Sequence, residues 1–194
     1  MIHKSATIDD GAKIGDKTNI WHYSHVRETA KIGTNCNIGQ NCYIESEIGN
    51  NVKIQNNVSV WHGVTIENDV FIGPCVTFTN DLYPRAFIWN DNRLETTLIK
   101  KGASIGANST IICGERIIGE YALVAAGSVV TKNIPNFGLV RGNPAKLVGF
   151  VCKCGHKLEK ISEEKDHIVM KCSDKTCKFD EKYNINKKDY EMIK

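Results

Sequence analysis

A six-residue repeat of aliphatic residues runs through most of this chain and constrains its fold more than any other feature. A large apolar residue occupies every sixth position in four runs, Ile2 to Ile44, Ile48 to Phe78, Ile99 to Ile111 and Ile118 to Val130. A period of six fits neither an amphipathic helix nor a simple alternating strand. It is typical of short strands that each turn one aliphatic side chain inward, joined by corners where glycine and asparagine tolerate positive φ. Stacking such strands in register predicts an all-β chain, a β-helix of hexapeptide repeats.

The repeat also predicts how the chain is organised. It is interrupted between Phe78 and Ile99 by a segment rich in aromatic residues, so we expect an external loop over residues 79–98. Loops this long in a compact domain are usually functional or disordered. Because this one carries Tyr83, Phe87 and Trp89, we expect it to pack against something and to contact substrate. The repeat ends near Gly149. We therefore expect a β-helix domain over residues 1–150 and a small cysteine-rich tail over residues 151–194.

Cysteine usage and charge narrow the class of protein. The chain has 194 residues, eight cysteines and a formal net charge of +3. It shows no apolar run of the roughly 20 residues that span a bilayer, and its first residues lack an apolar signal core. We therefore expect a cytoplasmic protein whose cysteines are thiols or metal ligands, and no membrane or nucleic-acid partner. The cysteines at positions 36, 42, 75 and 113 are expected to pack within the repeat.

The tail carries the other four cysteines in two clusters, Cys152 with Cys154 and Cys172 with Cys177. A segment this short hardly builds a core alone. Four thiolates hold zinc in many small modules, so the spacing predicts a zinc ribbon. His156 is an alternative ligand, and the alternative to zinc is a tail of reduced cysteines docked on the β-helix.

Several segments then point to a known family. They are IWHYSH at 20–25, IQNNVSV at 54–60, FTN at 78–80 followed by Pro84-Arg85, KKGASIGANSTIICG at 100–114, AAGSVVTKNIP at 125–135 and VRGNPAKLVG at 140–149. The last two resemble hexapeptide acyltransferases in general. The combination with FTN…PR resembles the narrower group of bacterial nucleotide-aminosugar N-acetyltransferases.

This resemblance implies a fold and an activity. The fold is a left-handed parallel β-helix in which three hexads make one coil, assembled as a homotrimer with sites between subunits. The reaction is acetyl transfer from acetyl-CoA to the amine of a UDP- or dTDP-linked 3-amino sugar, in lipopolysaccharide O-antigen or other surface-polysaccharide biosynthesis. The alternatives are O-acetylation of a sugar hydroxyl and a trimeric scaffold without catalysis.

Coil arithmetic adds a candidate catalytic pair. One coil of this family spans eighteen residues, which places Asn80 directly above His62, in a column that continues through Ser46, Glu28 and Asp10. The resemblance assigns Asn80 to orient the amino sugar, since an amide has no useful protonation range. His62 either accepts the amine proton, because imidazoles titrate near neutral pH, or only contacts the sugar. Relatives with the FTN…PR segment often lack a dedicated base and commonly carry an acidic residue at the position of His62.

The remaining candidates bind the two substrates. Those for the nucleotide sugar are His25, Glu28, Asn56, Asn57 and Arg85. Those for acetyl-CoA, mostly cations suited to its phosphates, are Lys100, Lys101, Ala126, Lys132, Arg141 and Lys146. A rival from another reaction class is a three-histidine zinc site of the hexapeptide carbonic anhydrases, built from His22, His25 and His62.

Overall fold

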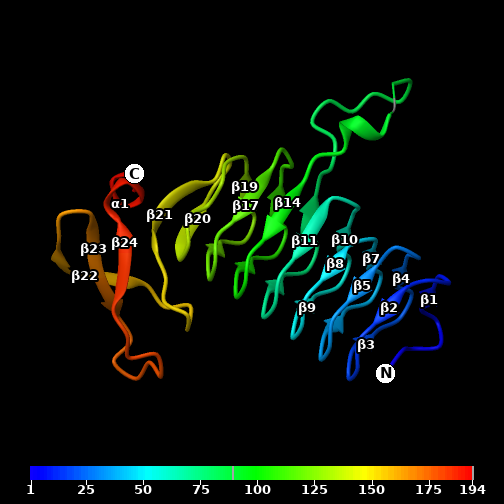
Figure 1. Cartoon of the computed structure of the whole chain (residues 1–194), viewed down its shortest axis with the longest axis horizontal. Coiled ribbons are helices and arrows are strands. Elements are labelled where there is room, and N and C mark those ends of the chain that lie inside the picture. Colours follow the sequence, from blue (N-terminus) through cyan, green and yellow to red (C-terminus); the bar gives the residue numbers. More distant parts are fainter. Residues whose placement is uncertain (89, 194) are drawn as a thin grey trace.

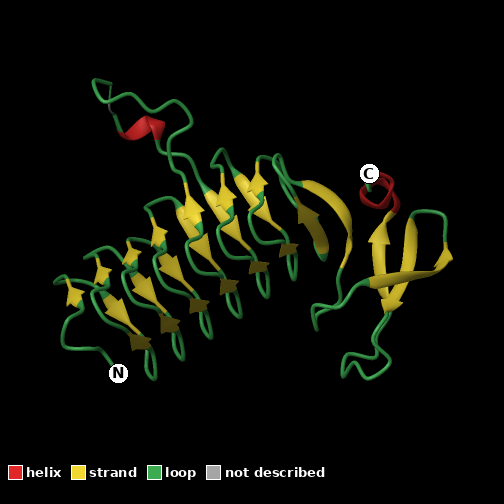
Figure 2. Cartoon of the chain, turned by 180° about the vertical axis from the view of Figure 1, so that it is seen from behind, coloured by secondary structure: helices red, strands yellow, loops and turns green. Residues whose placement is uncertain are grey.

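The computed structural model describes residues 1–88 and 90–193. Trp89, one of the expected loop aromatics, lies outside the described residues. Short strands stack into a solenoid with three flat faces, followed by a small tail (Figures 1 and 2). The chain visits the three faces in rotation, so strands three apart in sequence pair in parallel. The left-handed parallel β-helix that the resemblance implies is confirmed.

The first face contains β1 Thr7–Ile8, β4 His25–Val26, β7 Tyr43–Ile44, β10 Ser59–Val60, β13 Thr77–Phe78, β16 Thr110–Ile111 and β19 Val129–Val130. The second contains β2 Lys13–Ile14, β5 Lys31–Ile32, β8 Glu47–Ile48, β11 Val64–Ile66, β14 Thr97–Ile99 and β17 Arg116–Ile118. The third contains β3 Asn19–Ile20, β6 Asn37–Ile38, β9 Lys53–Ile54, β12 Phe71–Ile72, β15 Ser104–Ile105, β18 Leu123–Val124, β20 Gly138–Arg141 and β21 Lys146–Phe150. The last strand, β21, runs antiparallel to β20.

The repeated aliphatic side chains form the core, as the hexad pattern predicts. Ile20, Ile38, Ile54 and Ile72 are stacked on the third face and are fully buried. Burying each such side chain contributes roughly 2 kcal/mol. The chain end is an exception, because Ile2 is half exposed at the first coil.

At the corners, the residues with positive φ are not the ones that the repeat suggested. The glycine that follows the inward aliphatic has ordinary φ, and positive φ falls instead on corner residues such as Asn35 and Asn51. Gly33 allows two successive coils to approach each other closely, because a Cβ at this position would lie 2.5 Å from the carbonyl oxygen of Gly49 in the next coil. The cysteine expectation is also wrong at one position: Cys75 is exposed at a positive-φ corner, whereas Cys36, Cys42 and Cys113 are buried.

The corner where the chain passes from the first to the second face carries the external loop, and we call it the loop edge. The expected limit at residue 98 is two residues too late, because Thr97 already pairs with Val64 and Arg116 in the second face. The loop therefore covers residues 79–96 and includes a short 3-10 helix, Asp91–Arg93. It projects away from the solenoid (Figures 1 and 2). Inside the loop, the Arg93 guanidinium holds Asp81 at 2.9 Å and lowers the pKa of that carboxyl.

The tail forms its own antiparallel sheet from β22 Leu158–Glu163, β23 His167–Cys172 and β24 Tyr183–Asn186, followed by helix α1 Lys187–Glu191. It lies beside the last coils (Figure 1). The Tyr183 ring packs edge-on against Phe137, with centroids 5.0 Å apart, and Phe137 stacks on Tyr121. These aromatic rings connect the tail to the β-helix.

Candidate functional site

Asn80 and His62 occupy equivalent corners of successive coils at the loop edge. Ser59 of β10 pairs with Thr77 of β13, an offset of eighteen residues, so the expected eighteen-residue coil holds between the strands that precede His62 and Asn80. Asn80 is where the external loop leaves the solenoid, and its carbonyl oxygen accepts a hydrogen bond from the Glu95 N–H where the loop returns. The Asn80 side chain is partly exposed, and its amide has no hydrogen-bond partner among the described residues.

Lower on the same edge, an ionic network surrounds Glu28 and His25. Arg27 contacts Asp9 and Glu28 at 2.9 Å each, and His25 Nε2 lies 2.8 Å from Asp9. The hydrogen bonds from Arg27 lower the pKa of Glu28 to about 2 and raise the pKa of Arg27 itself. Glu28 and His25, both expected to contact substrate, are therefore bound to neighbouring side chains within this chain.

Tyr43, Glu45 and Trp61 extend this network toward His62, and the sequence reasoning missed them. Arg27 donates to the Tyr43 hydroxyl at 2.9 Å, and that hydroxyl donates to Glu45 at 3.1 Å. The rings of Tyr43 and Trp61 have centroids 4.9 Å apart. Burial raises the pKa of Tyr43. The offset between coils places Trp61 directly above Glu45, but the contact of Trp61 with Tyr43 depends on side-chain direction, which spacing does not give.

A shallow groove opens beside His62, on the side of the second face. It has a volume of about 380 Å³, and its lining includes Glu45, Ser46, Glu47, Lys31 and His62. Lys31 contacts Glu47 at 2.5 Å and thereby lowers the pKa of Glu47. Ser46 is only 6% exposed, and its hydroxyl has no hydrogen-bond partner in the part of the chain that the structure describes. A buried hydroxyl without a partner is costly unless a ligand satisfies it.

The remaining substrate candidates lie elsewhere. Asn56 and Asn57 sit at the corner between the third and first faces, where Asn56 accepts from the Gln40 N–H and Asn57 from the Asn41 amide. Within one chain the structure does not bring them to Asn80, and their side chains serve the turns. Arg85 is exposed and donates to the neighbouring Pro84 carbonyl within its own loop.

Two of the loop aromatics, Tyr83 and Phe87, are largely exposed. Tyr83 is 77% exposed and Phe87 is 84% exposed. The expectation that these rings pack against something is therefore not met inside a single chain, because the loop extends away from the solenoid (Figure 2). Such a surface suits a partner protein or a ligand.

The cofactor candidates divide between different corners. Lys132 and Lys146 meet in a mainly apolar cavity of about 280 Å³ at the end of the solenoid, which Met192 of the tail also lines. Lys100 and Lys101 lie at the corner between the second and third faces, and Ala126 lies at the corner between the third and first. Arg141 ends β20 and is exposed. One chain alone therefore does not gather these six residues.

The tail cysteines do come together. The sulfur atoms of Cys152, Cys154, Cys172 and Cys177 all lie within 4.8 Å of one another. The pairs Cys152–Cys177 and Cys154–Cys172 are 3.5 Å apart, far longer than a disulfide bond. A tetrahedral zinc with Zn–S bonds near 2.3 Å needs sulfurs about 3.8 Å apart.

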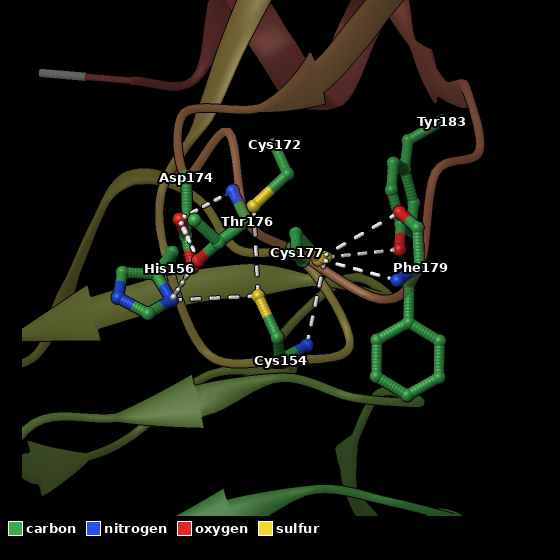
Figure 3. A network of polar contacts seen from close by, with 9 residues as sticks. Cys154, His156, Cys172, Asp174, Thr176, Cys177, Phe179 and Tyr183 are labelled. Carbon is green, nitrogen blue, oxygen red and sulfur yellow. Dashed lines mark hydrogen bonds and ion pairs between the residues drawn. The ribbon is translucent and has the colours of Figure 1, made fainter.

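The surroundings of these sulfurs resemble those of a thiolate site (Figure 3). The N–H groups of Cys154 and Phe179 donate to the sulfurs of Cys152 and Cys177, and the Tyr183 hydroxyl lies 3.1 Å from Cys152. Such contacts orient and stabilise metal-bound sulfur. His156 Nδ1 lies 3.5 Å from Cys154 but outside the four-sulfur group.

The three histidines of the carbonic anhydrase alternative are not gathered in one chain. His22 stacks on His3, with centroids 3.6 Å apart, while His25 binds Asp9. Among the described residues, the group with metal-ligand geometry is that of the tail cysteines.

Comparisons with known proteins show similarity to hexapeptide-repeat transferases. A model of the bacterial transferase hexapeptide family, with six repeats, matches residues 11–46 and 45–80. A hexapeptide-repeat acetyltransferase from Vibrio cholerae, solved with acetyl coenzyme A, superposes with a TM-score of 0.52 at 25% identity. That superposition covers 71% of this chain and 70% of the other. Residues 11–80 of this chain are therefore similar to the bacterial hexapeptide-repeat transferases.

Sequence relatives are more specific. Over 68 residues, the chain is 59% identical to dTDP-3-amino-3,6-dideoxy-alpha-D-galactopyranose 3-N-acetyltransferase from Aneurinibacillus thermoaerophilus, a match that covers 35% of each protein. Over 93 residues it is 41% identical to serine acetyltransferase 4 from Arabidopsis thaliana, covering 48% of this chain and 21% of that one. The matches therefore span about a third or less of these two relatives. No helix in the described residues is long and apolar enough to cross a bilayer.

Proposed function

We propose that this chain is an acetyl-CoA-dependent N-acetyltransferase that acts on the amine of a UDP- or dTDP-linked 3-amino sugar in bacterial surface-polysaccharide biosynthesis. The observation that carries the proposal is the corner where Asn80, whose amide has no hydrogen-bond partner among the described residues, stands above His62 at the foot of the external loop. The activity named for the Aneurinibacillus relative supports the same reaction.

The chemistry follows from the side chains at this corner. The neutral sugar amine attacks the thioester carbonyl of acetyl-CoA, forms an N–C bond and expels coenzyme A as its thiol. The Asn80 amide holds and orients the sugar. The proton lost by the amine passes to His62, to the leaving thiolate or to water; a general base contributes about 10²–10⁴-fold where one is used.

The assembly we propose is a homotrimer with its active sites between subunits. The exposed loop aromatics Tyr83 and Phe87 support it. So does the separation of the candidate acetyl-CoA residues onto different corners, because neighbouring subunits can bring different corners together. We also propose a cytoplasmic location, because the eight cysteines form no disulfide in the described residues and unpaired cysteines persist in reducing compartments.

We propose further that residues 151–194 are a separate module built around a structural zinc ion held by the four tail cysteines. The zinc would fix the tail sheet and has no part in acetyl transfer. Metal analysis of the full chain tests this: we expect about one zinc per chain, lost in Cys154→Ser and retained in Cys75→Ser, whose exposed cysteine lies outside the tail. A folded tail without metal would refute it.

The reaction is tested by thiol release from acetyl-CoA with UDP- and dTDP-linked 3-amino and 4-amino sugars. Asn80→Ala should lower kcat/KM by at least about 100-fold, because orientation is lost. Asn184→Ala, at an exposed position of β24, is the matched control and should retain activity. Thiol release with none of the sugars would reject the proposal. For His62, a kinetic pKa that disappears in His62→Ala supports a base role, and near-normal turnover excludes it.

A further inference from the structure

Glu45 belongs both to the hydrogen-bond network of Tyr43 and to the groove beside His62. It follows β7 at the loop edge, one coil below Trp61, and accepts a hydrogen bond from the Tyr43 hydroxyl. It also lines the groove beside His62. A molecule held at this corner would therefore meet the Glu45 carboxylate.

The cations around Glu45 are bound to other acids. Lys31 contacts Glu47, and Arg27 contacts both Asp9 and Glu28. Within residues 1–88 and 90–193, no lysine or arginine pairs with Glu45. The loop edge near His62 therefore carries more carboxylates than cations, and the field there is negative.

Two further side chains indicate that a polar, ring-shaped ligand fits here. Ser46 lines the groove, and its buried hydroxyl has no hydrogen-bond partner among the described residues, so a ligand group that reached it would satisfy it. Trp61 is 36% exposed and packs at a tilted angle against the Tyr43 ring. An exposed indole face attracts both cations and the C–H faces of rings.

From this arrangement we propose that Glu45, together with Trp61 and Ser46, forms a sugar subsite that selects a 3-amino sugar without a carboxylate. The inference rests on the proposed acetyl transfer and deepens it, since it chooses between a neutral hexose and a uronic acid as acceptor. Glu45 repels a carboxylate on the sugar ring and attracts its amine. Specificity then arises from repulsion of the wrong acceptor as well as attraction of the right one.

The test uses nucleotide-linked 3-amino hexoses that share one carrier and differ only at C6, which is a methyl, a hydroxymethyl or a carboxylate group. Binding is measured by calorimetry on the full chain without acetyl-CoA, and kcat/KM by thiol release. We expect the carboxylate sugar to bind about ten-fold more weakly than the methyl sugar, as charges several ångströms apart imply. Added salt should reduce this difference in affinity, because it screens the repulsion between the carboxylates.

Glu45→Gln should reduce the difference in affinity between the methyl and carboxylate sugars several-fold while keeping the Tyr43 hydrogen bond. Trp61→Ala should weaken binding of all three sugars. Glu159→Gln, an exposed tail position, should leave the preference unchanged. Equal or tighter binding of the carboxylate sugar overturns the inference, as does an equal effect of Glu45→Gln on all three sugars or a failure to bind any of them. Sugar binding with this preference but without thiol release supports the inference and rejects the proposed reaction.

Discussion

Most strands of the β-helix have two or three residues, whereas the tail strands β22 and β23 have six each. The short strands nevertheless bury fully their inward side chains, such as Ile54 and Ile105, because each coil covers the next. The longer tail strands bury only a small group, including Ile168, Met170 and Ile185. The lesson is that repetition creates a core from very short elements, while a single small sheet needs another stabilising group.

Removal of metal should produce the largest difference in stability between the tail and the β-helix. Structural zinc sites contribute roughly 10 kcal/mol or more to folding at neutral pH. A strong chelator should therefore unfold the tail beyond Val151 and leave the β-helix folded. Limited proteolysis with mass spectrometry should then cleave within residues 151–193 and spare the preceding coils. Equal cleavage with and without chelator would show that the tail sheet is stable without metal.

A methyl group between coils should produce the next largest effect. Gly33→Ala places a Cβ against the backbone of Gly49, so the coils must separate. We expect a loss of about 2–4 kcal/mol in the free energy of unfolding, measured by guanidinium titration. Gly149→Ala is the matched control, since a Cβ there meets nothing within 4 Å. Similar stability of the two variants would contradict the close coil contact.

Loss of the aromatic contact between the regions should have a moderate effect. Phe137→Ala removes the ring that touches both Tyr121 and Tyr183. We expect the tail to lose about 1–3 kcal/mol of stability, visible as faster amide hydrogen exchange in β23 and β24. Phe179→Ala, at a half-exposed tail position, should change exchange little. Unchanged exchange in the first variant would mean that the tail does not depend on this contact.

The smallest effect is expected from the Arg27–Glu28 pair. Because the folded-state pKa of Glu28 is lowered to about 2, the pair stabilises the protein above the ordinary glutamate pKa near 4.3. That contribution is lost as pH falls from about 4.5 to 2. Thermal melts of wild type and Glu28→Gln should therefore differ slightly at pH 7 and converge in acid. A difference that grows in acid would contradict the assigned pair.

The candidate site was predictable only in part. The eighteen-residue offset located Asn80 above His62, because inward aliphatics fix the register of every coil. Tyr43 and Trp61 were missed, since their contact depends on side-chain directions across coils rather than on spacing. Asn56 and Asn57 were assigned to substrate, but Asn57 takes the positive φ of the turn and Asn56 accepts a hydrogen bond from the Gln40 N–H. The sequence alone does not distinguish an asparagine that stabilises a turn from one that binds a ligand.

The sequence by itself determined the β-helix, its interruption and the split of the cysteines between repeat and tail. It did so because a strict period forces one side chain per strand into a shared interior. Only the tertiary structure decided which corner each polar residue occupies, and that four sulfurs from distant positions meet within 4.8 Å. The tertiary structure also showed that, among the described residues, no lysine or arginine pairs with Glu45 beside the candidate site. The physical reason is that charge pairing and metal geometry depend on distances between coils and strands, which no single period encodes.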